Sequence, residues 1–472
     1  MKKGTLKNII LVLLVASSVV LTFKIWFSEK LWPDGYNFFS NITEKFFQRR
    51  DYDKISLEHI TKPSAITVTN APKRSVYSDV SENYEKLRTL AQKAYSDSAD
   101  EGFEVADEKE WTNALRSKSI HIAYPVAFDS AILARTLNIS EGSGDAKAIK
   151  EYVVYSGDAV SSSIYVLIKD YRSGDIFKAV TNVEKQEFED MISEYALESV
   201  GTVPYSFELN FDKKEDDESL QKFVIAPDVQ LALAPKSYKD ITRRNALVER
   251  NGDYDYEGIE NILSTFGFNT SNAKRYVEND NSMVYVENYG TVKIHEDGLV
   301  EYKAVNDDKG IALSNKSNLT YDDTVALAVD MVNTMTKAVF NDRETDIRVT
   351  SDLIDEKEKV VKITFDYYIN GALASSFNDF SLSREPIERA VEIIITNSKV
   401  VSYRQMMSYF IVEDFKTPNV SAIDALDVLF ADKEFENYAH LTDLFPCYVL
   451  DEDGKGKITW GAVIDGIFKI IR

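Results

Sequence analysis

The chain has 472 residues, the length of roughly three ordinary domains at about 150 residues each. Its formal charge of −22 comes from 55 Lys and Arg against 77 Asp and Glu, and so acidic a surface repels phosphate backbones, which disfavours nucleic-acid binding. A single cysteine, Cys447, excludes an intrachain disulfide or a multi-thiolate metal site, and four histidines leave little room for metal chemistry.

An apolar run at residues 9–27 predicts a transmembrane helix after a short basic tail at residues 1–8. Its 19 residues would rise about 28 Å as a helix, close to the hydrocarbon thickness of a bilayer. The lysines of the tail predict a cytoplasmic N-terminus, with the remainder of the chain outside the cell membrane. A cleaved signal peptide is the competing interpretation, with a weak small-residue site at residues 15–17. We favour an uncleaved signal-anchor because the apolar run continues past that site.

The C-terminal end of the predicted span is expected to contact the membrane interface, and one face of it is expected to contact another helix. A lysine stem and three aromatic rings are suited to the membrane interface: Lys24, Trp26, Phe27 and Trp32. Small residues in the span would allow a neighbouring helix to approach closely, although small residues also occur in helices that face lipid. The predicted partner-binding face comprises Val12, Leu13, Ala16, Ser17 and Val20.

An aromatic juxtamembrane segment at residues 28–51 leads into a first extracytoplasmic domain, predicted at residues 52–205. Alternating apolar residues predict strands at 64–70, 118–125, 150–156 and 162–170. A helix is predicted over residues 79–95, where Tyr84, Leu87, Ala91 and Tyr95 share one face. Antiparallel strands with helices to one side fit this pattern.

A second domain is predicted at residues 206–312. Residues 240–250 are a short helical candidate, and residues 256–268 are a stronger one. Four short extended segments between residues 274 and 304 are separated by turns rich in Asn, Asp and Gly, which predicts an antiparallel meander.

The third domain is predicted at residues 313–472. Thr320 and Asp323 predict the start of a long helix, and strands follow at 346–352, 359–369, 389–395 and 398–404. Asn370-Gly371 is typical of a hairpin turn. A further helix at 421–431 precedes a strand pair that turns at Asp453-Gly454. The predicted fold class is α+β: one transmembrane helix followed by an elongated three-domain ectodomain of antiparallel sheets with flanking helices.

No motif in the sequence predicts catalysis. The histidines His59, His121, His295 and His440 are dispersed and form no short metal-binding spacing, and a satisfied strand or surface position is the simpler interpretation. No GxSxG motif occurs, and Cys447 lies in an apolar strand where burial is expected. The small domains offer no obvious cleft, although a glycosidase needs only two acids without fixed spacing. We predict no catalytic, metal-binding or cofactor-binding residue, and no cofactor.

Several stretches resemble the YycH family of low-GC Gram-positive bacteria. They are the span ending LTFKIW, the meander MVYVENYGTVKIHEDGLVEYKA, the helix at 321–340 followed by KVVKITFDYYINGALASS, and the later KVVSYRQM and KITWG. The resemblance covers most of the chain but rests on order and texture rather than on an invariant motif. The sister family YycI is similar in plan but shorter, so length favours YycH.

The resemblance implies a regulatory function without enzymatic activity. YycH-type proteins are bitopic, three-domain accessory proteins of the WalK–WalR (YycG–YycF) two-component system. They pair with YycI-type partners and modulate the sensor histidine kinase WalK, which controls cell-wall metabolism, chiefly through the span that maps here onto residues 9–27. The sign of regulation differs between members. Two alternatives stay open: a membrane-tethered cell-wall hydrolase and an extracytoplasmic ligand-binding module.

Overall fold

The computed structural model describes residue 57 and residues 62–471, apart from 80, 100–101, 138, 140–145, 158–160, 197–202, 210–222, 232–237, 249–252, 271–272, 315–318, 341–344, 356–358, 376–386, 417–420 and 433–438. The predicted span at 9–27 and the juxtamembrane segment at 28–51 lie outside these residues. Among the helices that are described, none combines the length and apolar character needed to cross a bilayer.

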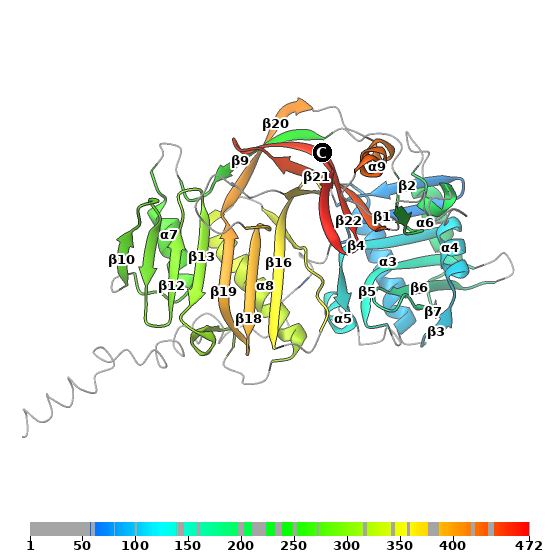
Figure 1. The fold of residues 1–472 in the computed structure, drawn as a ribbon. Coiled ribbons are helices and arrows are strands. Elements are labelled where there is room, and N and C mark those ends of the chain that lie inside the picture. Colours follow the sequence, from blue (N-terminus) through cyan, green and yellow to red (C-terminus); the bar gives the residue numbers. More distant parts are fainter. Residues whose placement is uncertain are drawn as a thin grey trace, which may run out of the picture.

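The N-terminal part of the chain forms a seven-stranded sheet in the order β2-β1-β4-β5-β6-β7-β3, and every neighbouring pair is antiparallel. Figure 1 shows this sheet in blue and cyan at the right. Its strands are β1 (Ala65–Asn70), β2 (Lys73–Tyr77), β3 (Glu104–Ala106), β4 (Ser119–Asp129), β5 (Ala148–Ser156), β6 (Ile164–Asp170) and β7 (Ile176–Thr181). The strands predicted by period-two alternation at 64–70, 118–125, 150–156 and 162–170 are confirmed.

Helices cover both faces of this first sheet, so the expectation of helices to one side is wrong. α3 (Tyr84–Ala99) and α6 (Lys185–Tyr195) pack on one face, whereas α4 (Glu108–Arg116) packs on the other through Trp111. The predicted buried face of α3 is confirmed, since Tyr84, Leu87, Ala91 and Tyr95 are all buried. Asp107 caps α4 by accepting a hydrogen bond from the Glu110 amide. α5 (Ser130–Leu137) follows β4, and a 3-10 turn (Ser206–Leu209) lies near α4.

The remaining strands form one sixteen-stranded sheet, whose main path runs β10-β11-β12-β13-β19-β18-β16-β17-β21-β22-β9-β20. Most pairs are antiparallel, while β21 pairs in parallel with β17 and β8. The strands are β8 (Phe223–Ile225), β9 (Lys239–Asn245), β10 (Lys274–Val277), β11 (Met283–Val286), β12 (Gly290–Ile294), β13 (Leu299–Ala304), β14 (Ile311–Ala312), β15 (Asp346–Val349), β16 (Val360–Ile369), β17 (Ala372–Ser375), β18 (Val391–Thr396), β19 (Lys399–Met406), β20 (Ser408–Lys416), β21 (Ala439–Leu450), β22 (Lys455–Ile464) and β23 (Ile467–Ile471).

In the described part of the chain, helices accompany this second sheet. α7 (Tyr256–Thr265) packs against α8 (Tyr321–Phe340), and α9 (Ala422–Ala431) lies beside β23. The predicted start of α8 is confirmed, because the Asp323 amide donates to Thr320 Oγ1 over 3.2 Å. A short 3-10 turn (Asp307–Lys309) precedes β14. The mixture of helices with largely antiparallel sheets agrees with the predicted α+β class.

Of two further predictions for the second sheet, one is confirmed and one is wrong. The predicted hairpin at Asn370-Gly371 is confirmed, with φ of 52° and 77°, respectively. The helix predicted at residues 240–250 is wrong, because Lys239–Asn245 forms β9 between β20 and β22. Those partners come from more than 150 residues later in the chain, and their backbone hydrogen bonds outweigh the weak helical pattern of the segment.

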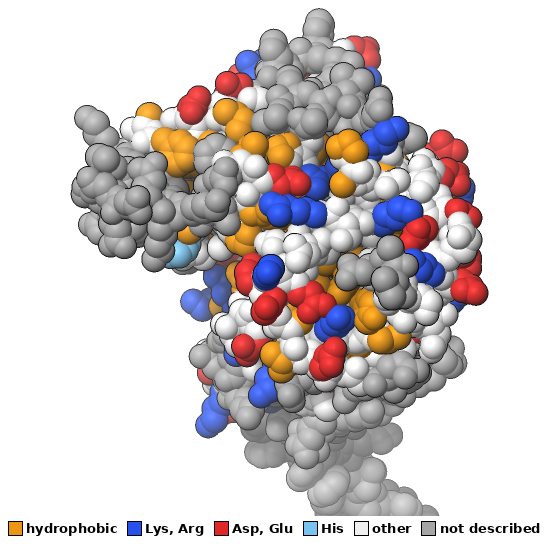
Figure 2. Space-filling model, turned by 90° about the vertical axis from the view of Figure 1, so that its right-hand side faces the viewer, with side chains coloured by type: hydrophobic (Ala, Val, Ile, Leu, Met, Phe, Trp, Pro, Cys, Tyr) orange, Lys and Arg blue, Asp and Glu red, His pale blue; other side chains and the backbone are white. Residues whose placement is uncertain are grey.

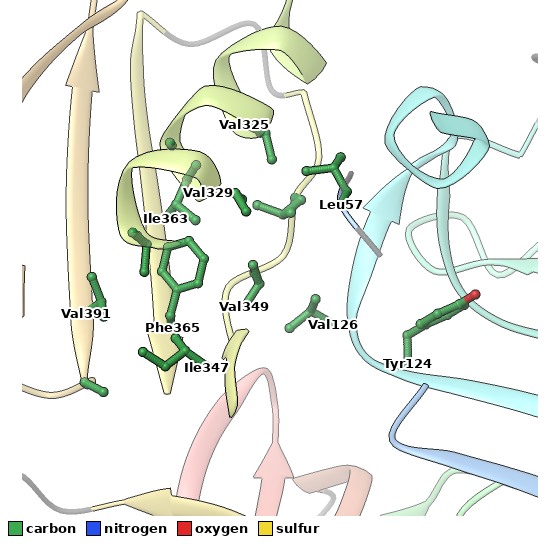
Figure 3. Close-up of a cluster of buried hydrophobic side chains, with 14 of the residues drawn as sticks. Leu57, Tyr124, Val126, Val325, Val329, Ile347, Val349, Ile363, Phe365 and Val391 are labelled. Carbon is green, nitrogen blue, oxygen red and sulfur yellow. The ribbon is translucent and has the colours of Figure 1, made fainter. Parts of the chain in front are cut away.

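One buried apolar cluster runs through both sheets. Figure 3 shows Leu57 and Val126 of the N-terminal part lying toward Val325 of α8 and Val349 of β15. Polar contacts join the same parts: Arg348 pairs with Asp79. The predicted boundary between residues 312 and 313 falls just after β14, inside the continuous second sheet, and the division into domains stays a prediction.

Candidate functional site

A cavity of about 470 Å³ lies between the face of the first sheet that packs against α4 and the C-terminal hairpin of β21 and β22. Figure 1 shows this hairpin in red, extending from the second sheet toward β1 and β4. The N-terminal side is formed by β4, β5 and β6 together with residues 226–230. Small-molecule sites commonly occupy about 300–1,000 Å³ at such interfaces between packed units.

Irregular strand pairing determines which side chains face the cavity. In the β5–β6 pair, Ile149 lies opposite Asp170 and Glu151 lies opposite Lys169, so Lys150 is an extra residue in β5. Such a bulge re-aims side chains that would otherwise alternate between the two faces. As a result, the adjacent residues Lys150 and Glu151 both line the cavity.

Glu151 lies at the centre of a buried hydrogen-bonded chain. Its Oε2 lies 3.0 Å from Nε2 of His121, and Nδ1 of that histidine lies 3.0 Å from the Tyr205 hydroxyl. Arg74 stacks 4.4 Å above the Tyr205 ring and pairs with Glu208. Because both ring nitrogens of His121 have partners, its orientation is fixed and Glu151 is held at the cavity wall.

A second carboxyl group faces the same point. Asp228 interacts with Glu151 and accepts a hydrogen bond from Lys169 Nζ over 3.0 Å. Burial, followed by the Asp228 charge, raises the pKa of Glu151 to about 7. Burial opposes ionisation of Asp228, but the Lys169 charge lowers the pKa of Asp228 to about 2. The two acids are therefore held in different protonation states near neutral pH.

An ion pair joins the hairpin wall of the cavity to the first sheet. Lys150 Nζ lies 2.8 and 2.6 Å from the two oxygens of Asp443 on β21. The side chains are 15% and 24% exposed, so water screens the pair only partly. Burial opposes charge on Lys150, yet Asp443 raises the pKa of Lys150 overall. The register of the β21–β22 pair shifts between Leu441 and Asp443, so both Lys150 and Asp443 lie at irregularities in their strands.

Aromatic rings form the wall of the hairpin. Phe445, Trp460 and Phe468 line the cavity, and the rings of Phe445 and Phe468 stack with centroids 5.9 Å apart. Gly461 makes room for this stack, since a Cβ there would lie 2.8 Å from Phe468 and 2.9 Å from Phe445. The cavity thus has a polar side on the first sheet and an aromatic side on the hairpin.

Cys447 does not contribute a nucleophile to this cavity. It lies on β21 and is fully buried, as the sequence analysis predicted. Burial raises the pKa of the Cys447 thiol to about 12, so its thiolate is scarce near neutral pH.

The predicted site residues and the observed cavity involve different parts of the chain. Val12, Leu13, Ala16, Ser17, Val20, Lys24, Trp26, Phe27 and Trp32 lie outside the described residues. The expectation of no obvious cleft is wrong, because the cavity walls come from segments up to about 400 residues apart. The available signal was charge inside predicted strands: Lys150-Glu151 opens KEYVVYS, and Lys169 lies next to the end of SSIYVLIKD.

Comparison with solved structures identifies a similar fold. The crystal structure of YycH from Bacillus subtilis superposes with a TM-score of 0.55 over 88% of this chain and 97% of that chain, at 10% sequence identity. An uncharacterized protein from Eubacterium rectale matches with a TM-score of 0.32, 13% identity and coverage of 55% of this chain and 92% of its own. No protein-family model matches the sequence, and no curated protein matches it. The chain therefore has a YycH-like fold.

Proposed function

We propose that the protein is a membrane-anchored, extracytoplasmic regulator of a WalK-type sensor histidine kinase and acts together with a YycI-type partner. The observation that carries the proposal is the YycH-like fold, which extends over 88% of the chain. The apolar run at residues 9–27 and the sequence stretches that resemble the YycH family add to it. The described part of the chain would then lie outside the cell, with residues 1–8 in the cytoplasm.

The proposed regulatory contact is between helices in the bilayer. The face would comprise Val12, Leu13, Ala16, Ser17 and Val20, with Lys24, Trp26, Phe27 and Trp32 at the interface. Close helix packing of this kind can favour one kinase conformation over another, and coupling energies of roughly 1–3 kcal/mol change an equilibrium by about 5- to 150-fold. The sign of the effect is set by which kinase state the contact favours.

A scrambled span tests this contact. Residues 10–23 are reordered at constant composition, and full-length protein is reconstituted with the kinase and the YycI-type partner in lipid vesicles. Wild-type protein is expected to change the rate of kinase autophosphorylation, whereas the scrambled protein is expected to leave the rate at its value for the kinase alone. Equal amounts of both proteins in the vesicles provide the control. If the scrambled protein changes the rate as the wild type does, the proposed contact is wrong.

We also propose that the protein is not an enzyme. The hydrolase alternative requires two carboxyl groups roughly 5–10 Å apart on either side of a substrate bond. In the cavity, Glu151 and Asp228 interact directly with each other instead of flanking a substrate bond. Purified wild-type protein should release no soluble fragments from peptidoglycan, and release that disappears in Glu151→Gln would contradict this proposal.

A further inference from the structure

We propose that the cavity between the first sheet and the β21–β22 hairpin binds an uncharged, hydroxyl-rich ligand the size of a small saccharide. This inference goes beyond kinase regulation and does not depend on it, because it concerns a binding site formed by the described residues alone. Its basis is the combination of volume, paired charges and aromatic walls.

The charges that line the cavity are already paired with one another or with their neighbours. Lys150 pairs with Asp443, Lys169 pairs with Asp228, and Arg389 Nη1 lies 2.8 Å from Asp366. An anionic or cationic ligand would have to replace one partner of such a pair. Removing a partner leaves a buried charge uncompensated, which is costly. The site therefore favours a ligand without formal charge.

The polar side of the cavity offers mainly hydrogen-bond acceptors. Glu151 and Asp228 provide carboxyl oxygens, and Gln230 Nε2 already donates to Thr67 Oγ1, which leaves the Gln230 carbonyl oxygen as an acceptor. On the facing hairpin the Thr442 hydroxyl donates to Asp443 and the Thr459 hydroxyl donates to the Ile471 carbonyl, so both hydroxyl oxygens can still accept. Several hydroxyl donors on one ligand match this set of acceptors.

The aromatic side of the cavity suits the other surface of a saccharide. Trp460 and Phe445 present rings whose faces carry partial negative charge, while Phe468 stacks on Phe445 and has the Arg389 guanidinium over its ring. The C–H groups on the face of a sugar ring carry partial positive charge and exclude water when they pack on such rings. A simple hydrocarbon would satisfy this wall but would leave the polar side desolvated and unpaired, which is unfavourable. The two walls together select a ligand with one apolar and one hydroxylated surface.

Calorimetry on the full-length protein tests this inference. The protein is held in nanodiscs of phosphatidylethanolamine and phosphatidylglycerol, because glycoside detergents would compete for the site. The uncharged probes are maltose and N,N′-diacetylchitobiose, and the charged comparators are glucosamine and glucuronate. Saturable binding of at least one uncharged probe, tighter than that of either comparator, is the expected result.

Two cavity variants and one control locate the binding. Trp460→Ala removes a stacking ring, and an aromatic contact of about 0.5–1.5 kcal/mol corresponds to roughly 2- to 12-fold weaker binding. Gln230→Leu keeps the side-chain volume but removes the amide, so it should also weaken binding. Tyr276→Ala removes a half-exposed ring on β10, away from the cavity, and should leave binding unchanged.

Thermal unfolding of each variant separates loss of binding from loss of folding, and Gln230→Leu keeps the test decisive if Trp460→Ala fails to fold. The proposal is overturned if neither uncharged probe saturates the wild-type protein, if a charged comparator binds more tightly, or if Gln230→Leu binds as the wild type does. A water-filled gap between two packed sheets would give the first of these outcomes.

Discussion

Glu151 is a carboxyl group that its surroundings keep partly protonated near neutral pH. Burial and the neighbouring Asp228 charge raise the pKa of Glu151 to about 7, whereas the ordinary pKa of a glutamate side chain is about 4.5. Between these two pH values the folded chain holds one more proton at this position than the unfolded chain does. The contribution of Glu151 to the free energy of unfolding is therefore greatest at low pH and falls as the pH rises through about 7.

Replacing Glu151 with glutamine removes this pH dependence. The free energy of unfolding of wild-type protein should fall relative to that of Glu151→Gln between pH 5 and pH 8, by on the order of 3 kcal/mol at most. Urea unfolding at several pH values across this range measures the difference. Asp228 does not interfere, because its pKa is lowered to about 2 and its contribution is lost only in stronger acid.

Glu301 provides the matched control, since its Oε2 also lies against a histidine, 2.6 Å from Nε2 of His295. Burial opposes ionisation of Glu301, but His295 and Arg404 lower the pKa of Glu301 overall. The contribution of Glu301 to the free energy of unfolding is therefore fully present above the ordinary pKa of a glutamate and is lost only as the pH falls below it. The difference between wild type and Glu301→Gln should lack the fall expected for Glu151→Gln. Parallel curves for the two variants would show that the pKa of Glu151 is not raised.

Two glycines separate backbone strain from steric conflict. Gly298 and Gly174 have φ of 95° and 75°, which disfavours any residue with a Cβ, by about 1–3 kcal/mol. At Gly298 a Cβ would also lie 2.6 Å from Asn245 Oδ1 and 3.1 Å from the Met407 carbonyl oxygen, whereas nothing lies within 4 Å at Gly174. Gly298→Ala should therefore lower the urea midpoint more than Gly174→Ala does. Equal losses would mean that the Asn245 side chain and the Met407 backbone move aside readily.

Among the elements, β5 and β21 are linked by Lys150 and Asp443 at the edge of the cavity. A double-mutant cycle with alanine at both positions should give a coupling energy of about 1–3 kcal/mol, because each charge is more than half buried and the contact is bidentate. The more exposed pair of Lys293 and Asp280 is the control and should give less than about 1 kcal/mol. Similar coupling energies in chemical denaturation would argue against a specific link between the two elements.

Local patterns predicted most elements but not their long-range pairing. The period-two strands of the first sheet and the apolar face of α3 are fixed by residues close in sequence. The strand at Lys239–Asn245 was mistaken for a helix because its partners, β20 and β22, follow more than 150 residues later. The extra residue at Lys150 has the same origin, since a bulge depends on the partner strand and leaves little trace in the strand's own pattern.

At the scale of the whole molecule, the cavity could not be predicted because it exists only where the first sheet meets the C-terminal hairpin. Arg135 also joins the two parts, with Nη1 3.1 Å from Asp322 and 3.2 Å from Asp323 at the start of α8. Charge on the described surface is mixed rather than uniformly acidic: Figure 2 shows Lys and Arg interspersed with Asp and Glu over the face in view. This face therefore does not indicate a partner that binds through a single uniformly charged patch.

We propose that the chain regulates a sensor histidine kinase through its N-terminal span. Affinity purification of full-length protein from membranes of the cell that encodes it, followed by quantitative mass spectrometry, tests this regulation. A WalK-type kinase and a YycI-type protein should be enriched with the wild-type chain, and the kinase should be depleted when residues 10–23 are scrambled at equal membrane abundance. Recovery of no histidine kinase, or equal recovery with the scrambled span, would contradict it.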